Sequence, residues 1–261
     1  MTLADTHPWH PYRLVQPTDR PDYETLIEGL ASAAWPEFML HDPVAGRLWD
    51  DLTTRFAAYQ FALLAPDEDL VVGMGNSVPL AWHGDLADLP ERGWDWAFEQ
   101  AVEDHAAGRT PTLQCALQIA LPPAVQGRGI SRLMVQAMRS LGQQQGLRQL
   151  IAPVRPSAKS QYPLAAIDRY ITWTTAEGLP FDPWLRVHAR LGARILKPCH
   201  EAMTITSSVA TWERWTGLRF PESGDYVVPG ALNPVSFDVP ADCGVYIEPN
   251  VWMIHGKETT E

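Results

Sequence analysis

The feature that most constrains how this chain can fold is a glycine-containing loop between a strand pattern and a helix pattern. Residues 112–121 alternate between apolar and polar or small side chains, which is typical of a β-strand. Residues 130–141 repeat apolar side chains at helical spacing, and residues 149–154 read as a further strand. The loop at 126–131 reads Gln-Gly-Arg-Gly-Ile-Ser. A strand, a helix and a second strand joined in this way predict an α/β unit.

The residue types of this loop predict a binding site for an anion. Gly127 and Gly129 lack a Cβ atom, so the backbone there can approach a ligand closely. The helix that follows presents unpaired N–H groups and the positive end of its dipole, which together suit a pyrophosphate. Arg128 and Arg132 add positive charge, and Ser131 can cap the helix or donate its hydroxyl to a phosphate. The alternative is a tight turn that binds no ligand.

Three families of phosphate-binding loop compete for this segment. A nucleotide-hydrolase loop requires Gly-x-x-x-x-Gly-Lys-Ser/Thr, and the lysine is missing. A dinucleotide-binding loop requires Gly-x-Gly-x-x-Gly, and Arg132 occupies the third glycine position. The loop resembles the Gln/Arg-x-x-Gly-x-Gly/Ala motif of the GNAT family of N-acetyltransferases, with Gln126, Gly129 and Ser131 in the marked positions. Ser131 departs from that motif, because glycine or alanine is usual there.

The resemblance implies a fold class and a domain organisation. It implies an α/β fold with a mixed, twisted sheet of six or seven strands and helices on both faces. We expect residues 1–206 to form a GNAT-like core that binds acyl-coenzyme A. Within this core, residues 156–181 are expected to be an insertion, and residues 207–261 are expected to be an extension packed on the same domain. Both additions are expected to cover the acceptor site.

The part before the loop fits the family only by the order of its elements. Residues 12–16 read as a strand, residues 21–30 and 44–58 as two helices, and residues 61–64 and 71–74 as two strands.

The resemblance also implies where the cofactor lies. In GNAT folds the strands before and after the loop splay apart, and the pantetheine arm enters the gap, of which residues 149–154 would form one wall. The residues nearest the thioester are expected to be the last two of the preceding strand. The expected acyl-coenzyme A site comprises Ala120, Leu121, Val125, Gln126, Gly127, Arg128, Gly129, Ile130, Ser131 and Arg132.

Acyl transfer to an amine requires a base and an acid. Many GNAT enzymes carry a glutamate on the strand before the loop, but the polar residues here are Gln114 and Gln118, which cannot act as bases. Many also have a tyrosine in the pattern Tyr-x-x-x-Gly-Phe, and His188 occupies the matching position on a helix that Asp182 and Pro183 begin. Histidine can act as acid or base near neutral pH. The resemblance therefore makes His188 the candidate catalytic residue, the alternative being a buried histidine with satisfied hydrogen bonds.

Polar residues follow the strand at 149–154. Ser157 could hydrogen-bond a carbonyl or carboxylate, and Arg155 and Lys159 could hold an anionic group of a substrate. His188 with Ser157 is similar to the histidine and hydroxyl pair of GNAT-like loading domains in polyketide assembly lines. Those domains decarboxylate malonyl-coenzyme A and pass the acetyl group to a carrier thiol. The alternative is a strand end with solvated charges.

The segment 246–255 offers one further candidate. Glu248 could contact the substrate and supply the missing base. The alternative is a turn followed by an edge strand. No spacing typical of metal ligands is visible in this segment, so no metal is expected.

The sequence thus predicts an acyl-coenzyme A-dependent acyltransferase of the GNAT type. We expect it to transfer an acetyl or other acyl group to a small-molecule amine or a carrier thiol. Two alternatives stay open. One is a GNAT protein that decarboxylates malonyl-coenzyme A, and the other is a regulatory protein that binds coenzyme A without catalysis, which the missing strand glutamate favours.

Composition limits the partners. The net charge of −11 disfavours nucleic acid, because contacts to phosphates need clustered lysine and arginine. No apolar run approaches the roughly 18–20 residues of a membrane span, and the first ten residues lack the order of a signal peptide. A cytoplasmic location is therefore expected. The sequence leaves the oligomeric state open, and its eleven tryptophans could form the core or the walls of a pocket.

Overall fold

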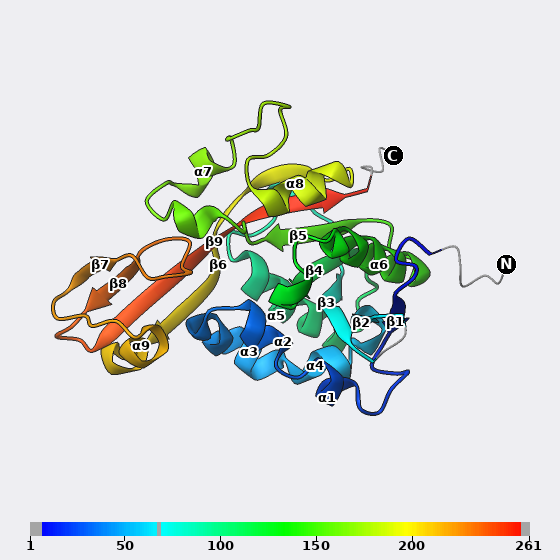
Figure 1. Ribbon diagram of the computed structural model, residues 1–261, viewed down its shortest axis with the longest axis horizontal. Coiled ribbons are helices and arrows are strands. Elements are labelled where there is room, and N and C mark those ends of the chain that lie inside the picture. The colour runs from blue at the N-terminus through cyan, green and yellow to red at the C-terminus, as the bar shows by residue number, and fades with distance from the viewer. Residues whose placement is uncertain (1–6, 67–68, 257–261) are drawn as a thin grey trace.

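The structure is a computed structural model that describes residues 7–66 and 69–256 (Figure 1). Its strands are β1 (Arg13–Val15), β2 (Phe61–Leu64), β3 (Val71–Leu80), β4 (Leu113–Ala120), β5 (Leu150–Val154), β6 (Arg194–Ser207), β7 (Gly224–Tyr226), β8 (Val235–Asp238) and β9 (Cys243–His255). Its α-helices are α1 (Tyr23–Ile27), α2 (Leu30–Ala34), α3 (Pro43–Leu48), α4 (Asp50–Thr53), α5 (Gly93–Ala106), α6 (Ile130–Gln144), α7 (Ile167–Tyr170), α8 (Pro183–Arg190) and α9 (Val209–Thr216). Short 3₁₀ helices are η2 (Glu37–His41), η3 (Ala57–Tyr59), η4 (Leu86–Asp88), η5 (Pro123–Val125) and η6 (Lys159–Gln161).

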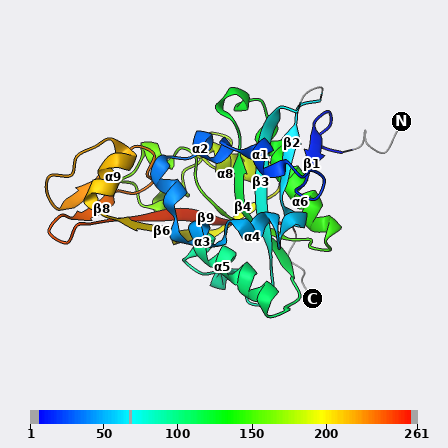
Figure 2. The same cartoon turned by 90° about the horizontal axis from the view of Figure 1, so that it is seen from below.

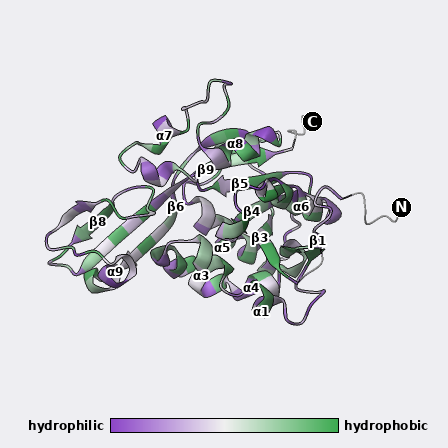
Figure 3. Ribbon diagram, in the orientation of Figure 1, coloured by the Kyte–Doolittle hydropathy of each residue, from purple (hydrophilic) through white to green (hydrophobic). Residues whose placement is uncertain are grey.

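These strands form one mixed sheet with helices on both faces. The strand order is β1-β2-β3-β4-β5-β9-β8-β7, and β6 pairs with β9. Neighbouring residues of β4 point to opposite faces. Cys115 packs in a cluster with Phe98 of α5, whereas the amide of Gln114 donates to the carbonyl of Met138 in α6. All ten residues of β3 are buried, and Figure 3 shows this strand coloured mostly as hydrophobic. The predicted α/β class is confirmed.

The sheet is larger than the predicted six or seven strands because the segment after residue 206 adds three. Strands β6 and β9 form a long antiparallel ladder that extends beyond the rest of the sheet. With β7, β8 and α9 this ladder forms an arm at one end of the molecule, at the left of Figures 1 and 2. The reading of 246–255 as a turn and edge strand is wrong. Ile254 of β9 pairs with Arg194 on β6 and with Ile151 on β5, so both edges of β9 are occupied there.

The strands β4 and β5 pair over a short stretch and then separate. Their parallel register joins Gln114 to Leu150 and Cys115 to Ile151, and it does not continue along either strand. Past Ile151, β5 keeps pairing with β9 on its other side as far as Val154. One edge of β4 is therefore open toward its C-terminal end, where the predicted gap lies.

The two helices predicted before β2 are each interrupted. Within residues 21–30 only Tyr23–Ile27 form a helix, α1, and Gly29 with a φ of 77° starts the next helix, α2, which continues beyond this range to Ala34. Residues 44–58 divide into α3, α4 and η3. The apolar spacing of these segments predicts helices, and it contains no signal for the points where the chain changes direction.

His200, which lies in an irregular part of β6, connects α7 to the segment before α5. Its Nδ1 lies 2.7 Å from the carboxylate of Glu91, and its Nε2 lies 3.0 Å from that of Asp168 in α7. The carboxylate of Asp168, followed by that of Glu91, raises the pKa of this histidine. Among the described residues, no helix is long and apolar enough to cross a membrane.

Candidate active site

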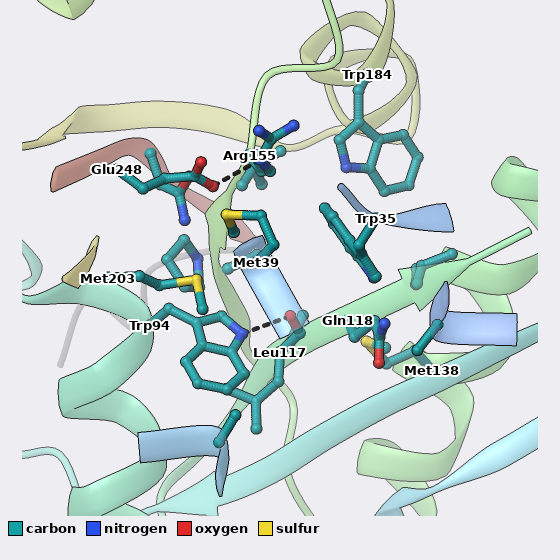
Figure 4. Close-up of a pocket in the computed structure, with 18 of the residues that line it drawn as sticks. Trp35, Met39, Trp94, Leu117, Gln118, Met138, Arg155, Trp184, Met203 and Glu248 are labelled. Atoms are coloured by element: carbon teal, nitrogen blue, oxygen red, sulfur yellow. Dashed lines mark hydrogen bonds and ion pairs between the residues drawn. The ribbon is translucent and has the colours of Figure 1, made fainter. Parts of the chain in front are cut away.

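A cavity of about 330 Å³ occupies the place where β4 and β5 separate. Residues 116–119 of β4 form one wall, and residues 152–155, at the end of β5, form the other. The remaining lining comes from helices on both faces and the residues next to them, from the start of β5, from β6 and from β9. It comprises Ala31, Trp35, Met39, Leu40, Ala45, Gly46, Trp49, Trp94, Val135, Met138, Leu150, Trp184, His188, Met203, Glu248 and Asn250. Figure 4 shows Trp35, Trp184 and Trp94 around this space.

The predicted phosphate loop joins β4 to the first turn of α6. Gly127 and Gly129 have φ of 76° and 80°, a backbone conformation that suits glycine. Gly129 is the N-cap of the 15-residue helix α6, and no side chain caps the helix there. The sequence suggested that Ser131 could cap the helix, but its side chain does not do so. No side chain occupies the first-turn N–H groups, although the N–H of Arg132 donates to the carbonyl of Gly129 at 3.2 Å. Arg128 and Arg132 are both exposed at this end of the helix.

The part of β4 that lines the cavity lies earlier in the strand than expected. Ala120 is buried and pairs with Met74, and Leu121 packs on the core under α6. Neither residue lines the cavity. The carbonyl of Leu121 instead accepts a hydrogen bond from Gln126 in the loop. The separation of the strands begins just after Cys115, which moves the open edge of β4 to residues 116–119.

An ion pair between Arg155 and Glu248 lies in the wall of the cavity (Figure 4). Nε of Arg155 donates to Glu248 at 2.6 Å, and Nη2 donates to the carbonyl of Gly230 at 2.6 Å. The hydroxyl of Tyr246 donates to the second oxygen of Glu248 at 2.7 Å. Burial alone would lower the pKa of Arg155, but Glu248 and Tyr246 raise it above its usual value. Nη1 of Arg155 makes no hydrogen bond to a described residue, so one nitrogen remains available to a ligand.

His188 faces the cavity from α8, the orientation expected from the sequence. Its ring is 2% exposed and packs edge-on against Trp184, with the ring centroids 4.3 Å apart. Its Nδ1 lies 2.8 Å from Nε2 of His255. Its Nε2 is buried and has no hydrogen-bond partner within the described part of the chain. Burial, followed by the neighbouring His255, lowers the pKa of His188 to about 3, so the ring is neutral at physiological pH.

Two amide side chains add further unpaired groups. The side-chain oxygens of Gln118 and Asn250, both lining residues, are buried without a hydrogen-bond partner among the described residues. An unpaired buried polar atom costs about 1–3 kcal/mol. With Nε2 of His188, these atoms favour a ligand that donates hydrogen bonds.

Beside the cavity, two carboxyl groups lie together in the core. Asp42 caps α3 by accepting the N–H groups of Val44 and Ala45, and its carboxyl contacts that of Asp95 on α5. Both residues are buried. Burial, followed by the charge of Asp42, raises the pKa of Asp95 to about 8, so Asp95 holds a proton near neutral pH. Ala45 and Gly46 of α3 line the cavity, and the pair therefore supports one of its walls.

Comparisons with known proteins identify the family. No protein-family model matches the sequence. The loading GNAT-like domain of CurA from Lyngbya majuscula superposes with a TM-score of 0.58 at 21% identity, covering 73% of this chain and 88% of that one. A GphF GNAT-like decarboxylase in complex with isobutyryl-CoA superposes with a TM-score of 0.54 at 18% identity, covering 95% and 99%. An arginine N-acetyltransferase of Aspergillus versicolor is 33% identical over an aligned length of 273 residues, covering 94% of this chain and 93% of that protein. The chain belongs to the GNAT superfamily. It is an acyl-coenzyme A-dependent acyltransferase.

Two residues expected at the site of this GNAT enzyme lie outside its cavity. Ser157 is exposed, and its hydroxyl lies 3.4 Å from the carboxylate of Asp182, which caps α8. Lys159 is fully buried, its ammonium donates to two backbone carbonyls, and burial lowers its pKa to about 8. Neither residue lines the cavity, so the structure does not bring Ser157 together with His188.

Several lining residues of the GNAT enzyme were not singled out by sequence. Trp35 directly follows α2, Met39 lies in η2, and Met203 comes from β6. The high tryptophan content was the available signal, because Trp35 and Trp94 are pocket walls. Among the described residues, no group of three or more His, Cys, Asp or Glu side chains could hold a metal ion.

Proposed function

We propose that this enzyme transfers an acetyl group from acetyl-coenzyme A to an amino group of a free basic amino acid such as arginine. The observation that carries the proposal is the cavity at the split between β4 and β5, which joins an arginine, an unpaired neutral histidine and tryptophan walls. The relative that is 33% identical is an arginine N-acetyltransferase, which supports this acceptor class. The cytoplasm, where coenzyme A is plentiful, is the expected location.

The proposed cofactor site follows the path from loop to cavity. The pyrophosphate would bind the N–H groups at the start of α6, with Arg128 and Arg132 beside it. The pantetheine arm would run along the open edge of β4 at residues 116–119, where the ladder to β5 has ended. On this edge the carbonyl of Leu117 already accepts a hydrogen bond from the indole N–H of Trp94 at 2.8 Å. The acyl group would then reach the cavity between the two strand walls.

The acceptor nitrogen must lose a proton during transfer. It attacks the thioester carbonyl carbon, the bond between carbon and sulfur breaks, and the proton passes from nitrogen to the leaving thiolate. His188 supports this step because its Nε2 is unpaired and its ring is neutral. A weakly basic imidazole is sufficient here, since the attacking nitrogen becomes strongly acidic once its bond to carbon forms. We assign His188 the role of carrying this proton.

Recognition of the acceptor would come from Arg155 and the indole walls. Nη1 of Arg155 could pair with the carboxylate of an amino acid, while Glu248 and Gly230 hold the rest of the guanidinium in place. Indole faces such as Trp49, at the exposed end of the lining, attract a guanidinium or ammonium group. Glu248 is bound to Arg155 and Tyr246, so we assign it to positioning and not to proton abstraction.

The test measures release of the coenzyme A thiol and the mass of the product. Acetyl-coenzyme A is incubated with arginine, with agmatine, which lacks the carboxylate, and with lysine. We expect N-acetylarginine from arginine and a much lower kcat/KM with agmatine. Arg155→Met should raise KM for arginine at least tenfold and leave KM for acetyl-coenzyme A within about twofold, because a lost charge-assisted hydrogen bond costs about 1.5–3 kcal/mol.

Two results would contradict the proposal. An equal kcat/KM for arginine and agmatine would show that Arg155 does not bind the carboxylate of the acceptor. Release of carbon dioxide from malonyl-coenzyme A, with no acetylated product from any of these amines, would favour decarboxylation instead. Arg13→Met, which removes an exposed arginine that pairs with Asp69, is the matched control.

A further inference from the structure

His188 belongs to a buried pair of histidines that the sequence did not reveal. His188 lies in α8, and His255 is the last residue of β9, where it pairs with Leu150 of β5. Figure 1 shows α8 beside the end of β9. The two rings are 2% and 1% exposed, and their nitrogens are 2.8 Å apart. His255 does not line the cavity, so it lies behind His188.

A hydrogen bond between two neutral imidazoles couples their tautomers. One nitrogen must donate and the other must accept. If Nδ1 of His188 donates, its Nε2 presents a lone pair to the cavity. If Nε2 of His255 donates, Nε2 of His188 must carry a proton instead. The state of His255 therefore decides whether His188 meets a ligand as an acceptor or as a donor.

The surroundings of His255 favour one of these arrangements. The backbone carbonyl of Leu191 acts on His255 in the direction that raises its pKa, which favours a proton on the outer nitrogen, Nδ1. Nδ1 has no hydrogen-bond partner among the described residues. The preference for a proton on Nδ1 therefore comes from the nearby carbonyl of Leu191 and not from a well-formed hydrogen bond. Arg139 donates to the same carbonyl, and burial and the charge of Arg139 lower the pKa of His255 to about 4. The ring is thus neutral and accepts at Nε2.

We propose that His255 is a positioning residue that holds His188 in the tautomer whose Nε2 lone pair faces the cavity. Nε2 of His255 accepts the Nδ1 proton of His188, fixes the plane of its ring and stabilises the positive charge that it gains on taking a proton. A pair with a purely structural role would have its outer nitrogens satisfied. Here the outer nitrogen of His188, Nε2, is buried without a partner among the described residues, and His188 lines the cavity.

The first test reads the tautomer without any substrate. Protein labelled with ¹⁵N-histidine is examined by NMR, in which protonated and unprotonated ring nitrogens have well separated shifts. We expect the protein to show His188 with its proton on Nδ1. His255→Leu should shift His188 toward a mixture of tautomers, whereas His255→Gln, which keeps an acceptor oxygen near the position of Nε2, should preserve the proton on Nδ1. His105→Leu, which changes a histidine on α5 outside the cavity, is the control.

The second test is kinetic, and it rests on the proposed acid–base role of His188. His255→Leu should lower kcat about 10- to 100-fold with KM for acetyl-coenzyme A unchanged, and His255→Gln should recover most of the loss. The double variant with His188→Ala should be no slower than His188→Ala alone, because the two residues act as one unit. A proton found on Nε2 of His188 in the unmodified protein would overturn the positioning role. If the proton is on Nδ1 of His188 as expected but His188→Ala does not change turnover, only the proposed acid–base function would be overturned.

Discussion

The buried carboxyl pair beside the cavity predicts an unusual dependence of stability on pH. In the unfolded chain, Asp95 has an ordinary pKa of about 4. In the folded protein its pKa is raised to about 8, first by burial and then by the charge of Asp42. Between these values the folded state binds one more proton than the unfolded state. The free energy of unfolding therefore decreases as the pH rises through this window.

The magnitude follows from the linkage. One extra bound proton gives a slope of about 1.4 kcal/mol per pH unit. Asp95→Asn removes the titrating group and retains an N–H donor toward Asp42. Between pH 5.5 and 7.5 the variant should therefore gain about 2–3 kcal/mol of stability relative to the unmodified protein. For a chain of this size, that gain corresponds to an increase in relative Tm of about 4–12 °C.

The assay is urea unfolding of both proteins at several pH values across this window. Asp88→Asn, which removes an exposed carboxyl group, controls for the change in net charge. A difference in unfolding free energy that stays constant with pH would refute the proton on Asp95 in the folded protein. A decrease in the stability of Asp95→Asn with rising pH, relative to the unmodified protein, would show that the carboxyl pair is stabilised by its charge.

Three further predictions concern other parts of the fold. Gly142→Ala should lower the free energy of unfolding by about 1–3 kcal/mol in urea unfolding, because the added Cβ would meet the buried Gln114 side chain from within α6. Gly129→Ala should destabilise the protein by about 1–2 kcal/mol through its φ of 80°, and a thermal-shift titration should show weaker binding of coenzyme A. His200→Gln should lower Tm at pH 5.5 and not at pH 9. A histidine with a raised pKa stabilises the fold below its unfolded pKa and loses this effect as the pH rises through the folded pKa. An equal decrease in Tm at both pH values would contradict the ion pairs of His200.

Elements that depend on local chemistry were predictable from sequence. The alternation along β4 and the spacing in α6 gave both elements with small errors at their ends. Asp182 and Pro183 predicted the start of α8, and Asp182 indeed accepts the N–H groups of Trp184 and Leu185. These signals lie within a few residues of the structure that they specify, so no distant partner is needed to interpret them.

Features that depend on distant partners were not predictable. Nothing in 246–255 indicates that β9 lies between two strands, because its partners β5 and β6 are far away in the chain. The same reason hid His255, whose importance comes from a contact 67 residues away. From the sequence, Lys159 could hold an anionic group or lie in solvent. In the structure it is buried, and its ammonium donates to the carbonyl of Leu232, which lies 73 residues away in the chain.

The central position of β9 has a consequence for how the protein is made. This strand follows all the other described strands in the chain, yet it lies between β5 and β6 and pairs with both. Until it emerges from the ribosome, both partners have unpaired hydrogen-bonding edges and exposed apolar side chains, a state that favours aggregation. Contacts between such distant segments also form slowly. Catalytic activity should therefore appear only after β9 has been synthesised and has paired with β5 and β6.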